Sequence, residues 1–169
     1  MQVRLRILFL AGIRIMTQNL TKPALPKVTL DLEDQLCFDL YAAARLITSA
    51  HRPFLLPLNL TYPQYVVMLT LWQHGPQTVT ELGEYLHLDS GTLSPLLKRL
   101  ETTGYVTRSK SALDERATII ELTPAGAALK ERVTDVPSAV ACQVGLKPEE
   151  KQKMQEQLRA MIARLSGDR

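Results

Sequence analysis

The amino-acid sequence predicts a mainly α-helical chain with a small β wing, the arrangement called a winged helix-turn-helix. Three observations in residues 78–123 support this fold class. Two short amphipathic segments at helical spacing are separated by a polar turn, an apolar strand follows, and a charged turn precedes a second apolar strand. The usual target of such a unit is double-stranded DNA. On both sides of it, apolar residues at helical spacing predict further helices from both termini. These helices form a helical dimerisation region if a second subunit covers their apolar faces.

We therefore expect one folded domain and one extension. Residues 1–29 form an N-terminal extension that is expected to be disordered, and residues 30–169 form the domain. Within the domain, residues 61–123 are assigned to the winged helix-turn-helix. Residues 30–60 and 124–169 are assigned to dimerisation helices.

The first helix of the winged unit has a well-defined predicted start. Thr78 precedes Glu81 by three residues, which is the spacing of a capping box. Val79, Leu82 and Leu86 then fall on one face of the helix.

The second helix carries a stripe of leucines that is expected to be buried. Asp89 or Ser90 can cap its start, and Gly104 occupies the left-handed position that would end it. Pro95 lies inside the helix, but within about two turns of its start, where a slight bend can be tolerated. The stripe consists of Leu93, Leu96, Leu97 and Leu100.

Polar side chains of the second helix face outward when this stripe is turned inward. Short hydrogen-bonding groups lie near the N-terminal end and cations lie further along, as in a recognition helix that contacts base edges and phosphates. An ordinary solvated helix face has the same pattern. The residues of this helix that we predict to contact DNA are Asp89, Ser90, Thr92, Ser94, Lys98 and Arg99.

A β-hairpin is predicted after the second helix. The β-prone segments 105–107 and 118–122 flank a charged segment, residues 108–116. The tip of such a wing can place Arg116 in the minor groove, and Asp114 can orient its guanidinium by a charge-assisted hydrogen bond. The wing residues that we predict to contact DNA are Arg108, Lys110, Asp114 and Arg116.

The segments outside the winged unit read as scaffold helices. The last one has an apolar stripe that needs a partner, either a second subunit or the chain's own domain. Breaks are expected around residues 135–137 and at Gly145. The predicted helices cover residues 32–56, a segment that begins after Thr61, residues 124–136 and residues 148–165.

Bulk charge does not identify a nucleic-acid-binding chain here. The formal net charge is +3 and the pI is about 8.9. However, three of the 20 basic side chains and none of the 17 acidic ones lie in residues 1–15. The rest of the chain carries as many basic as acidic side chains, so the DNA hypothesis depends on where a few cations are placed.

Residues 1–15 combine a basic start with a short apolar run. We interpret them as an upstream extension of the true start or a disordered arm, with a weak secretory signal as the alternative. No 18-residue apolar stretch occurs, so we expect no transmembrane helix, no membrane partner and a cytoplasmic location. Two cysteines and three histidines, without ligand spacing, predict no disulfide framework, no metal site and no cofactor.

Several spaced motifs mark the winged unit and the segment before it. L-E-x-x-G-Y-V-x-R, D-E-R and L-T-P-A-G occur in this order between residues 100 and 126, and this pattern resembles the MarR family of bacterial winged-helix regulators. L-C-F-x-L-Y at residues 36–41 and T-Y-P-Q-Y at residues 61–65 resemble its organic-hydroperoxide-sensing repressors. The resemblance implies a homodimeric repressor of operator DNA. An organic hydroperoxide would act as the effector by oxidising an amino-terminal cysteine and so releasing the DNA.

Cys37 is the cysteine in this position. A thiol reacts with peroxide as the thiolate, which the dipole at the start of a helix favours and the nearby Asp31, Glu33 and Asp34 oppose. Tyr41 lies one turn later on the same face. The alternative role of Cys37 is that of a small buried core residue.

The resemblance implies further roles around this thiol. It places Tyr62 against Cys37 from the opposing subunit, and His51 stands where similar proteins often have another tyrosine. Both side chains can donate a hydrogen bond that stabilises a thiolate. The apolar side chains expected around the thiol, which suit an organic peroxide, are Phe38, Leu40, Leu58 and Leu60.

Cys142 is the second redox candidate. The resemblance implies that Cys142 reacts with the oxidised Cys37 of the other subunit to form an intersubunit disulfide. The alternative is that Cys142 is a buried small residue in the small-residue stretch 138–145, without a redox role.

Two other functions are compatible with the sequence. One is a MarR-like repressor that a phenolic or drug-like ligand releases without covalent chemistry. The other is a thiol peroxidase that uses Cys37. The peroxidase hypothesis lacks an evident partner for turnover and does not explain the wing, so the chain is not expected to be an enzyme.

Overall fold

The structure is a computed structural model that describes residues 29–111, 114 and 116–167. The chain divides into two units, Met1–Gln35 and Leu36–Arg169. In the first unit the described residues form the 3-10 turn η1 (Leu32–Asp34). The extension predicted for residues 1–29 lies outside the described residues except for Thr29.

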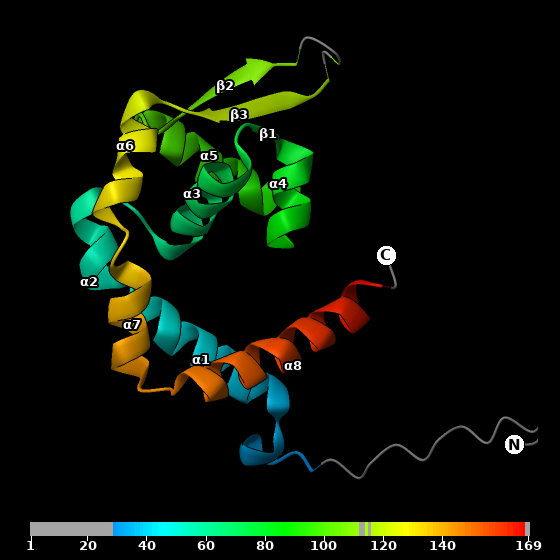
Figure 1. Ribbon diagram of the computed structural model, residues 1–169. Helices are drawn as coiled ribbons and strands as arrows, with labels where there is room; N and C mark the ends of the chain where they lie inside the picture. Colours follow the sequence, from blue (N-terminus) through cyan, green and yellow to red (C-terminus); the bar gives the residue numbers. More distant parts are fainter. Residues whose placement is uncertain (1–28, 112–113, 115, 168–169) are drawn as a thin grey trace, which may run out of the picture. The chain divides into compact units, whose positions relative to one another are not determined.

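The second unit is mainly helical and carries a small antiparallel sheet, which confirms the predicted fold class (Figure 1). Its strands are β1 (Gln77–Thr78), β2 (Val106–Lys110) and β3 (Thr118–Leu122). Its helices are α1 (Leu36–Ala50), α2 (Arg52–Leu55), the 3-10 turn η2 (Leu56–Leu58), α3 (Tyr62–His74), α4 (Val79–Leu86), α5 (Ser90–Thr102), α6 (Pro124–Arg132), α7 (Val136–Val144) and α8 (Pro148–Ser166).

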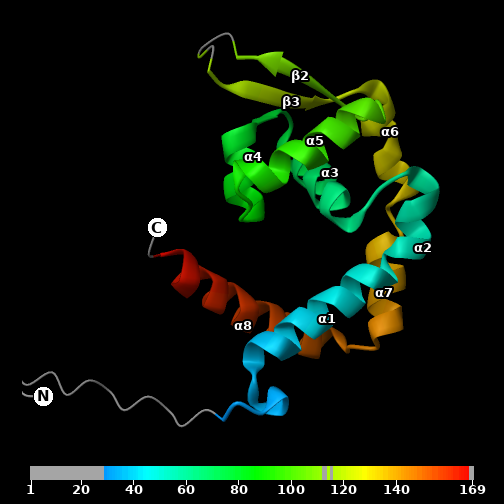
Figure 2. The ribbon, with the colours of Figure 1, turned by 180° about the vertical axis from the view of Figure 1, so that it is seen from behind.

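Helices α3, α4 and α5 and the sheet form the winged helix-turn-helix. Strand β3 lies between β1 and β2, and Ile120 pairs with Gln77 on one side and with Arg108 on the other. Seen from the front and from behind, the β2–β3 hairpin extends beyond the three helices (Figure 1, Figure 2). The order of two helices and two long strands predicted for residues 78–123 is therefore confirmed.

Capping residues begin α3 and α4 at the predicted places. The Thr78 hydroxyl accepts a hydrogen bond from the Glu81 N–H at 3.2 Å, and the Glu81 carboxylate accepts one from the Thr78 N–H at 2.7 Å. The hydrogen bonds that the Glu81 carboxylate accepts, first from the Thr78 N–H and then from the Thr78 hydroxyl at 2.8 Å, lower the pKa of Glu81. The Gln64 side-chain oxygen likewise accepts from the Thr61 N–H at 2.8 Å. Reciprocal bonds of this kind satisfy main-chain groups that have no partner inside the helix.

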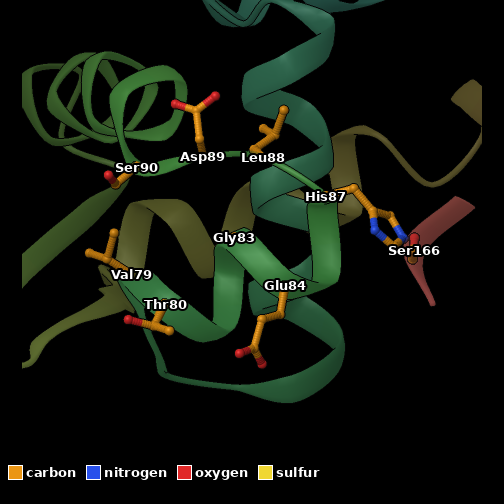
Figure 3. A pocket seen from close by; sticks show the side chains of 9 residues that line it. All are labelled: Val79, Thr80, Gly83, Glu84, His87, Leu88, Asp89, Ser90 and Ser166. Atoms are coloured by element: carbon orange, nitrogen blue, oxygen red, sulfur yellow. The ribbon is translucent and has the colours of Figure 1, made fainter. Parts of the chain in front are cut away.

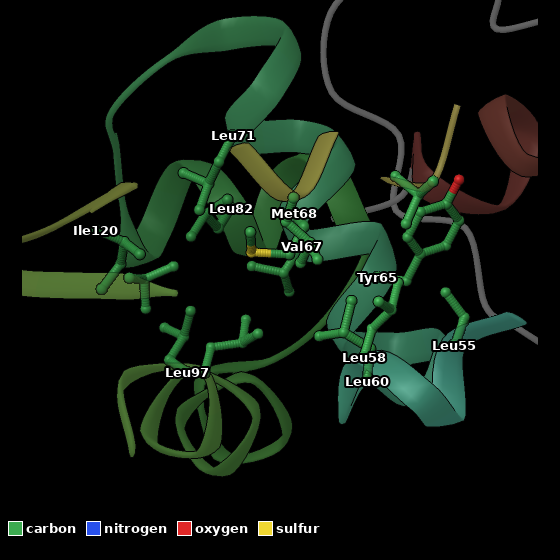
Figure 4. Packing of buried hydrophobic residues seen from close by; sticks show 14 of the residues in the cluster. Leu55, Leu58, Leu60, Tyr65, Val67, Met68, Leu71, Leu82, Leu97 and Ile120 are labelled. Carbon is green, nitrogen blue, oxygen red and sulfur yellow. The ribbon is translucent and has the colours of Figure 1, made fainter. Parts of the chain in front are cut away.

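The core of the second unit forms around α3. Val67 and Met68 of this helix are fully buried, and Leu71 is 1% exposed. Figure 4 shows these side chains meeting leucines from α4 and α5 and an isoleucine from β3. Burying each such side chain contributes about 1.5–3 kcal/mol. The partners from the other elements are Leu82, Leu93, Leu97, Leu100 and Ile120.

The prediction of one long helix over residues 32–56 is wrong. Gln35 has an extended backbone, which separates η1 from α1, and His51 separates α1 from α2. Pro53 explains the second break, because proline has no N–H to donate within a continuing helix and its ring crowds the preceding turn.

The predicted hairpin also differs from the structure in its extent. Strand β2 continues to Lys110, which pairs with Thr118, so Arg108 and Lys110 belong to a strand and not to the turn. The turn is closed by a hydrogen bond from the Ser111 N–H to the Ala117 carbonyl at 3.0 Å. The short strand β1 was not predicted, because two residues show no alternation.

Helix α7 was not predicted. The helix predicted for residues 124–136, with a break around residues 135–137, ends at Arg132, and α7 begins at Val136. Pro137 lies in the first turn of α7, where a missing N–H costs no intrahelical bond. Val136 and Val140, four residues apart, are both buried and dock this helix onto the core. The predicted break at Gly145 is confirmed, with φ at +73°.

The base of the wing is joined to α3 and α6 by a close main-chain contact. A Cβ atom on Gly126 would lie 2.0 Å from the Tyr105 carbonyl oxygen, so only glycine fits. The Trp72 indole N–H donates to the Gly126 carbonyl at 2.9 Å, and the Thr123 hydroxyl donates to the Gly104 carbonyl at 2.6 Å. Strand β2 and helices α3 and α6 therefore hold one another in place.

Candidate DNA interface and candidate thiol site

Asp89 caps the predicted recognition helix α5. Its carboxylate accepts hydrogen bonds from the Thr92 N–H at 2.8 Å and from the Thr92 hydroxyl at 3.1 Å. These bonds lower the pKa of Asp89. Of the two predicted caps, Asp89 or Ser90, the structure therefore uses Asp89, and its carboxylate is engaged with the helix end.

The outward face of α5 is exposed along its whole length, as predicted. Leu93, Leu97 and Leu100 are fully buried on the opposite face. The Ser94 hydroxyl donates to the Ser90 carbonyl at 2.7 Å, so this side chain is turned onto its own helix. The exposed residues of this face are Ser90, Thr92, Ser94, Lys98 and Arg99.

The wing adds cations on β2. Arg108 and Lys110 are two residues apart, so they lie on the same face of the strand, and both are exposed. Arg116 is exposed at the end of the turn. The Asp114 carboxylate accepts a hydrogen bond from the main-chain N–H of Arg116 at 2.9 Å. This contact shapes the turn, and it differs from the predicted bond to the guanidinium.

Cys37 lies in the first turn of α1 and is exposed, so it is not a buried core residue of the described chain. The apolar surroundings expected for its thiol are not assembled within the described residues of the chain. Leu58 and Leu60 are buried in the core around α3, whereas Phe38 is 40% exposed. Tyr41, one turn after Cys37, accepts a hydrogen bond from Arg45 at 3.3 Å.

His51 and Tyr62 meet at the opposite end of α1. The His51 ring is only 8% exposed and lies 4.7 Å from the Tyr62 ring in an edge-to-face arrangement. Its Nδ1 lies 2.8 Å from the Ile47 carbonyl oxygen. Because a carbonyl only accepts, Nδ1 is the donor in this contact, and Nε2 is an acceptor in the tautomer that carries its proton on Nδ1.

Tyr65 completes this ring cluster and was not predicted as a site residue. Its ring centroid lies 6.1 Å from that of His51 and 6.3 Å from that of Tyr62. Among the described residues its buried hydroxyl has no hydrogen-bond partner. Burial, and then the nearby Tyr62, raise the pKa of Tyr65. The T-Y-P-Q-Y motif contained this residue, but helical spacing alone assigns it to the core.

Cys142 is exposed on α7, a helix that was not predicted from the sequence. It is therefore not a buried spacer in the described chain. Within the described residues both cysteines are free thiols.

A hollow of about 460 Å³ borders the start of α5 (Figure 3). Val79, Thr80, Gly83 and Glu84 of α4 line it together with the segment 87–90, and Ser166 of α8 contributes at its edge. No lysine or arginine is among these lining residues, whereas the carboxylates of Glu84 and Asp89 are.

Two absences hold for the part of the chain that the structure describes. No group of three or more His, Cys, Asp or Glu side chains there could hold a metal ion. No single helix there is long and apolar enough to cross a membrane. One bent pair of helical segments, residues 36–58 and 62–74, passes the test for a membrane span when length and composition alone are considered. The second member of this pair is the core helix α3.

Comparison with known proteins identifies the family. The family described as "MarR family" matches residues 60–118. The organic hydroperoxide resistance transcriptional regulator of Bacillus subtilis (strain 168) is 52% identical over 109 residues, which cover 64% of this chain and 74% of the relative. The chain belongs to the MarR family.

Solved structures of another regulator agree with this assignment. Reduced AbfR bound to DNA is 39% identical, with a TM-score of 0.68, and the match covers 79% of this chain and 94% of that one. Disulfide-formed AbfR is 37% identical, with a TM-score of 0.58, and the match covers 78% and 92%. AbfR is a protein of Staphylococcus epidermidis.

Membership of the MarR family makes this chain a DNA-binding transcriptional regulator and not an enzyme. The structure places the predicted DNA-contacting residues of this MarR chain on two neighbouring elements, α5 and the wing. It also brings His51 and Tyr62 together. In the described residues, however, no hydrogen bond or ring contact joins Cys37 to either of them.

Proposed function

We propose that this MarR-family chain is a homodimeric repressor that senses organic hydroperoxides by oxidation of Cys37. One observation carries the proposal. Cys37 is exposed at the first turn of α1, the pair His51–Tyr62 lies just beyond the other end of the same helix, and the helix between them exposes apolar side chains.

The exposed apolar residues of α1 and α8 support a second copy of the chain as their partner. Leu46 is 73% exposed on α1, and Leu165 is 72% exposed on α8. Exposed apolar side chains in this number on two helices are typical of an association surface. A two-fold dimer buries the same patch on both subunits. The other exposed apolar residues of the two helices are Leu36, Phe38, Tyr41, Ile47, Met154 and Ile162.

A two-fold dimer also solves the problem of distance. Cys37 and Ala50 lie at opposite ends of α1, about 20 Å apart at 1.5 Å per residue, so Cys37 cannot reach the His51–Tyr62 pair of its own chain along this helix. Two copies of α1 that pack side by side across a two-fold axis perpendicular to them run antiparallel, and this is the arrangement that we propose. The start of one helix then lies beside the end of the other, and Cys37 faces the partner's pair.

The proposed redox step is a two-electron oxidation of sulfur. The Cys37 thiolate attacks the terminal oxygen of the hydroperoxide, the S–O bond forms and the O–O bond breaks. The alkoxide leaves and takes a proton from solvent, so the products are a sulfenic acid and an alcohol. The sulfenic acid then condenses with the Cys142 thiol of the partner to give a disulfide and water.

Disulfide formation accounts for release of DNA. A disulfide needs Cα atoms roughly 4.4–6.8 Å apart. If α1 and the partner's α7 must move to reach that distance, the attached wings move with them. The half-site spacing of about one helical turn is then lost. The solved forms of the relative AbfR, reduced on DNA and disulfide-formed, support this type of switch.

DNA recognition in this proposal uses α5 and the wing. The exposed end of α5 enters the major groove with Ser90 and Thr92, and Lys98 and Arg99 contact phosphates. Arg108, Lys110 and Arg116 of the wing contact the backbone and the minor groove. Asp89 and Asp114 act indirectly, because their carboxylates hold the helix start and the turn.

A groove between α3 and the segment 130–137 favours a second candidate function. It has a volume of about 490 Å³ and includes Tyr65, Leu69, Trp72 and Lys130 among its lining residues. Apolar and aromatic walls with one cation suit a small phenolic ligand, which would release DNA without chemistry at sulfur.

A gel-shift experiment separates these functions. The protein is bound to a DNA duplex that it has selected from a random library and is treated with cumene hydroperoxide, then with dithiothreitol. The redox proposal predicts that peroxide releases the wild-type protein from DNA and that dithiothreitol restores DNA binding. It also predicts that the Cys37→Ser variant stays bound to DNA in the presence of peroxide. Release of Cys37→Ser by the same peroxide, or irreversible release of the wild type with Cys37 unmodified, contradicts it.

A further inference from the structure

The Tyr65 hydroxyl is the one polar side-chain group that the fold buries without a hydrogen bond in the part of the chain that the structure describes. The residue is only 2% exposed. Figure 4 shows the hydroxyl directed away from Leu55, Leu58 and Leu60. Burying such a group without a partner destabilises the fold, so a phenylalanine would be the more stable residue here. A partner for this hydroxyl is therefore expected from outside the described chain.

The surroundings of the hydroxyl indicate what the partner is. Tyr65 lies in a cluster with Tyr62 and His51, in which every ring lies within 6.3 Å of the other two. Tyr62 is half-buried, and His51 presents Nε2 as an acceptor because Nδ1 donates to the Ile47 carbonyl. The cluster thus offers two phenol donors and one imidazole acceptor.

This set of groups is complementary to a hydroperoxide. The two peroxide oxygens accept hydrogen bonds, and the terminal O–H donates one. Three aromatic rings supply an apolar wall for the organic part of the molecule. Hydrogen peroxide has the same polar group but nothing to place against that wall.

We infer that the Tyr65 hydroxyl is a binding and catalytic group of the sensor, which donates a hydrogen bond to the peroxide oxygen that leaves as alkoxide. The inference rests on the proposed function, in which the partner's Cys37 attacks the other oxygen. Negative charge develops on the leaving oxygen as the O–O bond breaks, and a donor already in place stabilises that charge. The phenol keeps its proton, and the alkoxide takes a proton from solvent, as in the step described above.

A pair of tyrosine-to-phenylalanine variants tests this role. Tyr65→Phe removes a hydroxyl that has no bond to lose within the described residues, whereas Tyr105→Phe removes one that donates to the Leu58 carbonyl at 3.0 Å. The measurements are the rate of Cys37 thiol loss with cumene hydroperoxide, followed by mass spectrometry of the full chain, and the melting temperature.

The two variants should respond in opposite ways. Tyr65→Phe should lower the oxidation rate on the order of 100-fold, the scale of a lost oxyanion donor, and leave the melting temperature unchanged or raised. Tyr105→Phe should lower the melting temperature by about 2–6 °C and leave the rate unchanged.

Two results would overturn the inference. One is a Tyr65→Phe rate within about twofold of the wild type. The other is a fall in the Tyr65→Phe melting temperature as large as that of Tyr105→Phe, because the hydroxyl would then have a structural partner. Failure of the proposed function is a separate result, since Cys37 of the wild type would then not react with the peroxide.

Discussion

Asp89 joins local structure to DNA recognition at the scale of one residue. Its carboxylate caps α5 through the Thr92 N–H and hydroxyl, and these bonds lower its pKa. The stabilisation is therefore fully present above the pKa of the unfolded chain, about 3.9, and is lost as the pH falls through the lower pKa of the folded state. Asp89→Ala should lower the free energy of unfolding at neutral pH, and the difference from wild type should shrink below about pH 4.

Asp135 provides the matched control for this prediction. It stands at the N-terminal cap of α7, but its side chain makes no capping hydrogen bond. Asp135→Ala should therefore change urea unfolding curves little at any pH. A difference between Asp89→Ala and wild type that stays constant into acid would show that the cap does not act through the carboxylate.

Structural roles that depend only on residues nearby in the chain could be predicted from the sequence. The capping box of Thr78 and Glu81, the cap at Asp89 and the left-handed Gly104 at the end of α5 are all found, because each depends on residues within a few positions. Tyr65 was missed because the burial of its hydroxyl without a hydrogen bond depends on the three-dimensional positions of rings on other turns and elements. Helical spacing assigns such a tyrosine only to the core.

The wing is the element whose contribution to affinity is most open to direct test. Arg116 is exposed at the end of its turn, and Asp114 holds the main chain there. Arg116→Ala should weaken operator binding by about 1–3 kcal/mol while dimerisation stays intact. Gel-shift titration measures the loss. Arg159→Ala, which removes an exposed arginine from α8, serves as the control and should leave affinity unchanged. Equal affinity of the two variants at physiological salt would remove the wing from the mechanism.

The elements that the sequence mispredicted depend on distant contacts. Strand β2 runs past Thr107 to Lys110 because β3 offers it a pairing edge, and β1 exists only because Ile119 and Ile120 lie beside it. Helix α7 contains Pro137, whose helix-breaking signal is overridden by its place in the first turn. Local propensity carries no information on either effect.

At the scale of the whole molecule, the proposed mechanism needs two chains. Leu46 is 73% exposed on α1, and in a dimer it would lie in the interface. Leu46→Glu should raise the dimer dissociation constant by on the order of 100-fold, because a carboxylate would be buried there without a partner. Operator affinity should fall with it, since two linked wings read two half-sites.

Leu69→Glu is the matched control for dimerisation. Leu69 is an exposed leucine at 41%, but it lies on α3 beside the groove and away from α1 and α8. Analytical ultracentrifugation should show a dimer for this variant and a shift to monomer for Leu46→Glu. Dimers of equal strength in both variants would place the interface elsewhere and remove the route from Cys37 to the partner's Tyr62.

Non-reducing gel electrophoresis of the cysteine variants tests the central claim most directly. After treatment with cumene hydroperoxide, the wild type should form a cross-linked dimer that dithiothreitol reverses. Cys37→Ser should bind DNA normally, form no cross-link and ignore the peroxide. Cys142→Ser should form the Cys37 sulfenic acid without a cross-link. A cross-link that persists in Cys142→Ser as a Cys37–Cys37 bond, or DNA release that persists in Cys37→Ser, would contradict the account.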